Sequence, residues 1–209
     1  MILIGQYDSP FVRRVGIAMT LYGLDFEHRP WATFGDGDLI APYNPLRRVP
    51  TLVLDDGRVI IESAYILDYI DELKGEGALI AKSGPQRQQA LYYIALATGF
   101  SDKCVALFYE RELHTETSDI WFDRLNLQIG AVLDRLEAIR TEAKTPWLFG
   151  DAVGHADIAL GCALRHARDA HGDHIAWAKW PALAAHSAAC EALDVFKAIF
   201  QPFIGPSGD

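Results

Sequence analysis

The chain has 209 residues, of which 50% are hydrophobic and 22% are charged. This composition excludes intrinsic disorder, which requires few apolar residues and a high density of charge. The formal net charge of −9 argues against nucleic acid as a partner, because phosphate binding requires a basic face. The only cysteines are Cys104, Cys162 and Cys190, and their wide spacing indicates buried thiols in a reducing compartment rather than a disulfide framework.

The sequence shows no targeting or membrane-spanning signal. The N-terminus has no basic segment of the kind that opens a signal peptide, and Asp8 follows its first apolar run. The longest uncharged stretch, residues 88–101, is shorter than the ~20 apolar residues that span a membrane. We therefore expect a cytoplasmic protein with no membrane contact.

The start of the chain shows the pattern of a strand, a helix and a second strand. A short apolar run at residues 2–7 is followed by Ser9, a good N-cap, and by Pro10, which favours the first helical position. Apolar residues then recur at helical spacing through residues 11–22. A second β-rich run covers residues 25–29, and the short helical crossover predicts that the two strands are parallel.

A hairpin and another helix follow a loop that is rich in Gly, Asp and Pro. Residues 51–54 and 59–61 are β-rich runs joined by an Asp-Gly turn, which is a hairpin signal. Helical spacing begins after Ser63 and ends near Gly75. The sequence pattern of the first 75 residues therefore predicts a mixed sheet of four strands.

The remainder of the chain predicts helices throughout. Glycines and a proline gather at residues 76–84, which we interpret as a linker. Beyond it, residues 85–209 show helical spacing and no strand pattern. The predicted organisation is an α/β domain at residues 1–75 followed by an all-helical domain at residues 85–209.

Three features of the α/β part predict a ligand site at one edge of the sheet. Pro50 stands just before a strand, and a cis bond there would leave the main chain of Val49 free to pair with an extended peptide. The helix that starts at Ser63 offers free N–H groups to a carboxylate, and the neighbouring Glu62 could accept from an ammonium group. Ser9 lies at another helix N-terminus, where a thiolate is stabilised.

Taken singly, each of these features also has a purely structural explanation. A Ser-Pro pair is usually only a helix cap, Pro50 could be an ordinary strand-edge proline, and Glu62 with Ser63 could be one more helix start. Tyr7 is a rival to Ser9 for a catalytic hydroxyl, although a helix-cap hydroxyl has better access to the helix dipole. The pattern alone therefore leaves both readings open.

In chain order, the motifs resemble the cytosolic glutathione transferase family, in particular small bacterial members with a serine at the catalytic position. The matching segments are residues 9–13 (Ser-Pro-Phe-Val-Arg), 44–52 (Asn-Pro-Leu-Arg-Arg-Val-Pro-Thr-Leu), 62–63 (Glu-Ser), 150–151 (Gly-Asp), 156–159 (Ala-Asp-Ile-Ala) and 180–183 (Trp-Pro-Ala-Leu). The resemblance covers nearly the whole chain. It implies a thioredoxin-like N-terminal domain that binds glutathione, followed by a helical C-terminal domain.

The resemblance also implies a role for each residue of the site. Ser9 contacts the sulfur of glutathione, and Val49 pairs through its main chain with the cysteinyl part, with Pro50 in the cis form. Glu62 and Ser63 hold the γ-glutamyl end. Glutathione is then a co-substrate, and neither a resident cofactor nor a metal is expected.

Two further residue assignments follow from the resemblance. The family is usually a homodimer, so Asp102 of the partner subunit is expected to reach the ligand. The loop before residue 44 lacks the Lys or His that some members use for the glycyl carboxylate, so Arg47 or Arg48 is expected there. The expected function is transfer of glutathione to a small apolar electrophile. The alternatives are a glutathione-dependent isomerase or dehalogenase, and a non-catalytic binding protein with the transferase fold.

Overall fold

The computed structural model describes residues 1–205 and divides into two compact units. Of these residues, the first unit comprises Met1–Lys82 together with the segment 193–205, and the second unit is Ser83–Ala192. The sequence predicts a single helical domain for residues 85–209, whereas the contacts assign the segment from Leu193 onward to the first unit.

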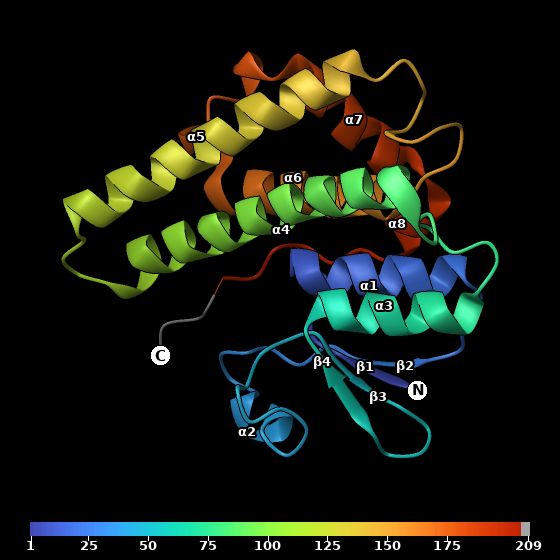
Figure 1. Cartoon of the computed structure of the whole chain (residues 1–209). Helices are drawn as coiled ribbons and strands as arrows, with labels where there is room; N and C mark the ends of the chain where they lie inside the picture. The colour runs from blue at the N-terminus through green and yellow to red at the C-terminus, as the bar shows by residue number, and fades with distance from the viewer. Residues whose placement is uncertain (206–209) are drawn as a thin grey trace. The chain divides into compact units, whose positions relative to one another are not determined.

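The helices and strands of the two units follow one another along the chain (Figure 1). The first unit contains β1 (Ile2–Ile4), α1 (Pro10–Leu21), β2 (Glu27–Arg29), α2 (Gly37–Ile40), β3 (Thr51–Val53), β4 (Val59–Ile61), α3 (Ser63–Lys74) and α8 (Asp194–Ala198). The second unit contains α4 (Gly84–Leu113), α5 (Asp119–Glu142), α6 (His155–His171), two 3₁₀ turns (Gly172–His174 and Trp177–Lys179) and α7 (Pro181–Ala192).

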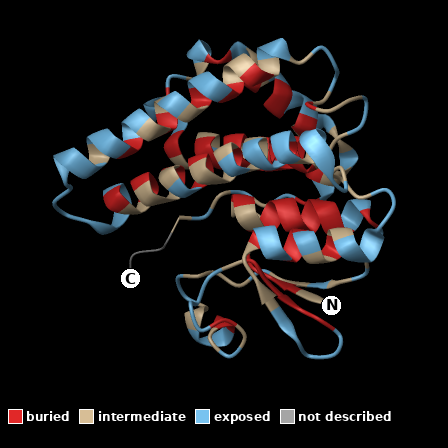
Figure 2. Ribbon diagram, in the orientation of Figure 1, coloured by how far each residue is buried: buried red, intermediate tan, exposed pale blue. Residues whose placement is uncertain are grey.

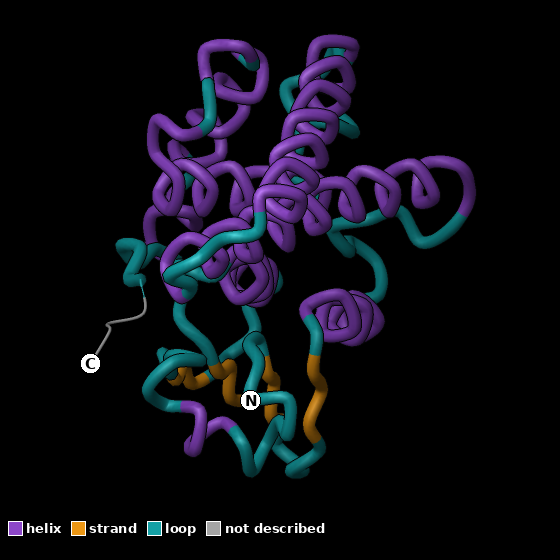
Figure 3. The backbone as a smooth tube through the Cα atoms, turned by 90° about the vertical axis from the view of Figure 1, so that its left-hand side faces the viewer, coloured by secondary structure: helices purple, strands orange, loops and turns teal. Residues whose placement is uncertain are grey.

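The sheet of the first unit confirms the predicted mixed topology. Its strand order is β2-β1-β3-β4, with β1 parallel to β2 and antiparallel to β3, and with β3 antiparallel to β4. Helices α1 and α3 lie side by side on one face, as the end-on view in Figure 3 shows. This is the arrangement of a thioredoxin-like domain.

The two faces of the sheet pack against different partners because successive side chains on a strand alternate. Leu3 and Leu52 contact the α1 and α3 side, whereas Ile4 and Val53 contact Ile40 of α2 on the other side. Helix α1 is buried along almost its whole length, while α3 keeps one exposed face (Figure 2). The short α2 lies inside the segment that the sequence predicts as a loop.

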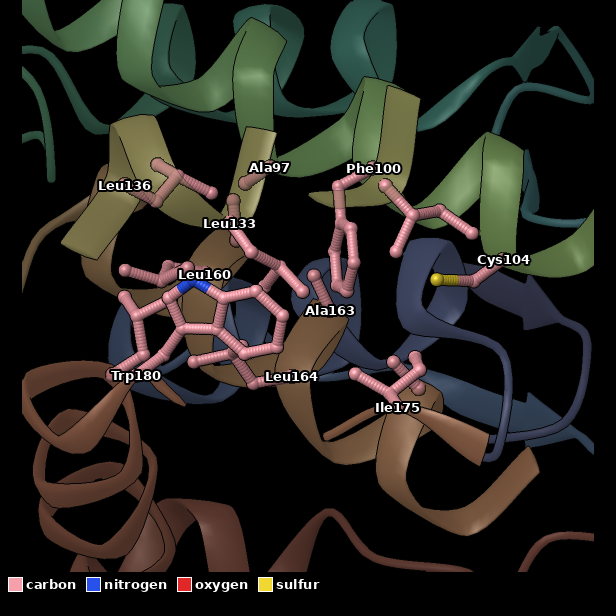
Figure 4. Packing of buried hydrophobic residues seen from close by; sticks show 14 of the residues in the cluster. Ala97, Phe100, Cys104, Leu133, Leu136, Leu160, Ala163, Leu164, Ile175 and Trp180 are labelled. Carbon is pink, nitrogen blue, oxygen red and sulfur yellow. The ribbon is translucent and has the colours of Figure 1, made fainter. Parts of the chain in front are cut away.

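The second unit is built around α4, α5 and α6, whose apolar side chains interdigitate (Figure 4). Phe100 and Leu107 of α4 and Leu133 of α5 are fully buried in this cluster. By length and composition, α4 alone in the described chain could also span a membrane, yet its inner face forms part of this core. The three cysteines are buried and form no disulfide, as the sequence predicts. Burial raises the pKa of the Cys104 thiol.

Candidate functional site

Strand register brings the three predicted site segments to one end of the sheet. Ile4 is paired with Thr51, and Thr51 is paired with Ile61 on its other side. The loop after β1, the residues before β3 and the residues after β4 therefore all leave the sheet at that end. Ser9 follows the first of these pairing positions, Val49 precedes the second, and Glu62 follows the third.

Ser9 is the N-cap of α1, as predicted. Its backbone is extended, and its Oγ accepts a long 3.4 Å hydrogen bond from the Val12 N–H. Pro10 occupies the first helical position, where a missing N–H costs nothing. A partly buried hydroxyl at the positive end of a 12-residue helix is suited to an anion.

Tyr7, the other candidate for the catalytic hydroxyl, has a ring that packs against His28. The ring stacks on His28 at a centroid distance of 3.8 Å, and the Nε2 of His28 lies 2.8 Å from the Gly5 carbonyl oxygen. Burial raises the pKa of Tyr7 to about 12 and so disfavours its anion. Of the two hydroxyls, only that of Ser9 lies at a helix N-terminus.

Val49 offers main-chain groups to a ligand at the start of β3. The Val49–Pro50 bond is cis, and within residues 1–205 neither the N–H nor the C=O of Val49 has a hydrogen-bond partner. Such a free donor and acceptor can pair with an extended peptide as a strand would.

Asn44 fixes the turn that presents Val49, a role that the sequence analysis did not assign. The side chain is 2% exposed, and its Nδ2 donates to the Arg48 carbonyl at 2.9 Å and to Thr51 Oγ1 at 3.1 Å. Its Oδ1 accepts from the Leu46 N–H at 3.0 Å. The Asn-Pro pair at residues 44–45 is a signal that could have been recognised, because asparagine before proline favours the start of a turn.

Gly5 is a second residue whose role the sequence analysis missed. Its φ of 128° lies in a region that favours glycine, and an added Cβ would lie 2.6 Å from Val12 Cγ2 and 2.7 Å from Val49 Cβ. Gly5 therefore lets the start of α1 and the Val49 loop approach each other closely. No hydrophobic pattern could have revealed this, because the crowding comes from residues distant in sequence.

Glu62 and Ser63 form the third part of the site. Glu62 has a φ of 66° and no side-chain cap bond, and Ser63 is the buried first residue of α3. The carboxylate of Glu62 lies 3.3 Å from Arg48 Nη1, with both side chains about half exposed. Helix N–H groups therefore lie beside a carboxylate, an arrangement that suits an amino-acid head with both of its charges.

Comparison with known proteins identifies the family of the chain. A family model described as "Glutathione S-transferase, N-terminal domain" matches residues 3–78, and one described as "Glutathione S-transferase, C-terminal domain" matches residues 119–189. Glutathione transferase GST 23 of Zea mays is 32% identical over 76% of this chain and 68% of its own length. The chain belongs to the glutathione S-transferase family.

Other relatives match most or all of this chain. The uncharacterized GST-like protein YibF of Escherichia coli is 29% identical over 78% of this chain and 80% of its own. The solved glutathione S-transferase of Methylobacterium radiotolerans, in complex with glutathione sulfonate, is 27% identical, with a TM-score of 0.90 and coverage of 100% and 97% of the two chains. The transferase of Methylobacillus flagellatus, with glutathione bound, is 26% identical, with a TM-score of 0.86 and coverage of 95% and 98%.

The two arginines of this transferase that the sequence left open have different partners. Arg47 Nη1 bonds to Asp38 Oδ1 at 2.6 Å, whereas Arg48 is paired with Glu62. Arg48 thus lies beside the γ-glutamyl end of the predicted site, and Arg47 lies toward the start of α2. Both ion pairs are exposed, so each contributes at most about 1 kcal/mol and either arginine can turn to a ligand.

The remaining predicted site residue, Asp102, is an exposed residue of α4 in the second unit. Its role depends on a partner subunit and stays a prediction. Within residues 1–205, no group of three or more His, Cys, Asp or Glu side chains is placed to hold a metal ion.

Proposed function

We propose that this chain binds glutathione at the end of its four-stranded sheet and activates the thiol for attack on a small apolar electrophile. The γ-glutamyl end meets Glu62 and Ser63, the cysteinyl part pairs with Val49, and the sulfur reaches Ser9. The register that gathers these three segments at one end of the sheet carries the proposal. Two solved relatives, one with bound glutathione sulfonate and one with bound glutathione, support it.

The chemistry requires little beyond positioning and stabilisation of charge. The glutathione thiol loses its proton, and the thiolate accepts a hydrogen bond from the Ser9 hydroxyl at the positive end of α1. The sulfur then attacks the electrophilic carbon while the leaving group departs. Because both reactants are bound together, proximity lowers the barrier, and the fixed hydroxyl and helix dipole stabilise the charged sulfur.

The protein would act as a cytoplasmic homodimer in which Asp102 of the partner subunit contacts the same ligand. Activation of the thiol at Ser9 separates this proposal from a non-catalytic binding protein, which needs the Val49 and Glu62 contacts but not Ser9. An isomerase or dehalogenase would keep all three contacts and differ only in the second substrate.

The test measures glutathione binding by calorimetry together with turnover of 1-chloro-2,4-dinitrobenzene. Glu62→Ala or Ser63→Ala should weaken the affinity about tenfold or more, because bonds to charged groups contribute ~1.5–3 kcal/mol. Glu72→Ala, which removes an exposed carboxylate elsewhere on α3, is the matched control. Unchanged affinity in both site variants would reject this binding site, and binding without turnover would favour the non-catalytic protein.

A further inference from the structure

The C-terminal segment returns to α1 and is fixed there by a buried arginine. Arg13 is 3% exposed, and its Nε and Nη2 donate to the carbonyl oxygens of Ile199 at 2.8 Å and Phe196 at 2.9 Å. These carbonyls belong to the end of α8, where a cation is favourable. Gly16 of α1 gives Ile199 room, because an added Cβ would lie 3.1 Å from Ile199 Cγ2.

Beyond this anchor, two hydrogen bonds tie the segment to the loop between β1 and α1. The Tyr7 N–H donates to Gln201 Oε1 at 3.2 Å, and the Ile204 N–H donates to Asp8 Oδ2 at 3.1 Å. Tyr7 and Asp8 directly precede Ser9 in the chain. Residues 201–204 are therefore held beside the end of the site to which we assign the glutathione sulfur, and Figure 1 shows this segment passing α1 in red.

The segment carries apolar side chains that are partly exposed. Phe200 is 41% exposed and Ile204 is 57% exposed, while Phe203 is partly buried. Burial raises the pKa of Asp8, and the backbone amides of Ile204 and Ser9 act in the opposite direction. The Ile204 amide thus helps to keep a partly buried carboxylate ionised at this position.

We propose that Asp8 is a positioning residue that holds residues 201–204 as an apolar wall beside the bound thiol and thereby limits the size of the electrophile. This inference rests on the proposed function. Asp8 is not assigned a contact with a reacting atom, and it acts on the segment through the Ile204 amide. Releasing that amide should open the site to bulky electrophiles while leaving the glutathione contacts at Val49 and Glu62 in place.

The experiment compares two halides that react by the same displacement but differ in bulk, iodomethane and 1-(chloromethyl)naphthalene. In each case a sulfur–carbon bond forms, the carbon–halogen bond breaks, the halide leaves with the bonding pair, and the thiol proton passes to solvent. The readout is the ratio of kcat/KM for the naphthyl substrate to that for iodomethane. Hydrogen exchange of the Ile204 amide reports whether the segment is released.

Three variants distinguish loss of the hydrogen bond between Asp8 and the Ile204 amide from a general disturbance of the fold. Asp8→Ala removes the acceptor, Ile204→Pro removes the donor without changing Asp8, and Asp8→Asn keeps an acceptor oxygen. We expect the two releasing variants to speed amide exchange in the segment and to raise the selectivity ratio by about tenfold each. Asp8→Asn should stay within about twofold of wild type. The double variant should not exceed Asp8→Ala, because the bond between Asp8 and the Ile204 amide is already lost in that variant.

The outcomes distinguish this inference from the proposed function beneath it. If wild type turns over both halides and the releasing variants free the segment without changing the ratio, only the inference is overturned. The same holds if neither variant alters amide exchange of the segment, because the hydrogen bond between Asp8 and the Ile204 amide then does not hold the segment in place. A wild type that binds no glutathione in calorimetry overturns the proposed function and this inference with it.

Discussion

At the scale of single residues, the proposed chemistry depends on how strongly the Ser9 hydroxyl stabilises the thiolate of bound glutathione. A free thiol has a pKa near ~8.5, so only a small part of it is ionised at neutral pH. A hydroxyl bond to a charged acceptor contributes ~1.5–3 kcal/mol, and each ~1.4 kcal/mol corresponds to about one pKa unit. Ser9 can therefore lower the pKa of bound glutathione by roughly one to two units.

Ser9→Ala should raise the pKa of the bound thiol and slow conjugation at neutral pH. Glutathione affinity should change much less, because Val49, Glu62 and Ser63 are untouched. The defect should shrink at alkaline pH, where the thiol ionises without help. Thiolate absorbance of the binary complex against pH measures this directly. Tyr7→Phe is the matched control, and a titration curve that shifts only in Tyr7→Phe would assign the role to tyrosine.

Gly5→Ala should destabilise the fold through crowding and backbone strain together. A Cβ at Gly5 meets Val12 and Val49 at less than 3.0 Å, and the φ of 128° is unfavourable for alanine. Each effect costs about 1–3 kcal/mol, so we expect a loss of roughly 2–4 kcal/mol in denaturant unfolding. Gly57→Ala is the control, since Gly57 also has a positive φ of 85° but nothing lies within 4 Å of an added Cβ. Equal losses in both variants would mean that crowding at Gly5 is absent.

At the scale of elements, the start of α6 is organised by a buried carboxylate. Asp157 is fully buried, and its two oxygens accept from the Leu148 N–H at 2.9 Å and the Gly154 N–H at 3.0 Å. Through the second bond, Asp157 satisfies the N–H of Gly154, the N-cap residue of α6. His186 of α7 lies beside this cap, with its Nε2 3.8 Å from Asp157 Oδ1, too far for a hydrogen bond.

His186 should lower the stability of the second unit as the pH falls. Burial, assisted by the charge of Arg140, lowers its pKa from 6.5 to about 4. The unfolded chain therefore binds a proton more readily than the folded chain, and stability is lost as pH falls from about 6.5 to about 4. The loss from this residue approaches about 3 kcal/mol, and His171, whose pKa is also lowered by burial, adds a slope of the same sign.

Denaturant unfolding between pH 7 and pH 4 measures this slope. His186→Gln should flatten it, whatever the stability of the variant at pH 7. His114→Gln is the control, because the His114 side chain is 58% exposed. A slope that is unchanged in His186→Gln would show that other groups cause the acid sensitivity.

At the scale of the whole molecule, we predict a homodimer that shares its glutathione sites. Light scattering at micromolar concentration should give twice the chain mass of 23.2 kDa. Asp102→Ala should weaken glutathione binding in the dimer if the partner subunit contributes to the site. Asp119→Ala, which removes an exposed carboxylate at the start of α5, serves as its control. A monomer that binds glutathione with full affinity would contradict the shared site.

Much of the first unit was predictable because its signals are local. The Ser9 cap, the Asp-Gly hairpin and the helix that begins at residue 63 each follow from neighbouring residues, and all are confirmed. The short helix α2 was not predicted, because four residues within a Gly- and Asp-rich loop carry no periodic signal. The return of the segment from Leu193 onward to the first unit was also missed, because helical spacing does not reveal which neighbour a helix contacts.

The sequence by itself determined the fold class, since periodicity, caps and turns act over a few residues. The candidate site residues came from its resemblance to a known family, because each of those local patterns alone also has a structural explanation. Only the tertiary structure decided how those residues are supported. Gly5 against Val49, Arg13 on the Ile199 carbonyl, and Asp8 on the Ile204 amide depend on contacts between segments far apart in the chain. Such contacts arise when the sheet pairs and the helices pack, so no local pattern records them.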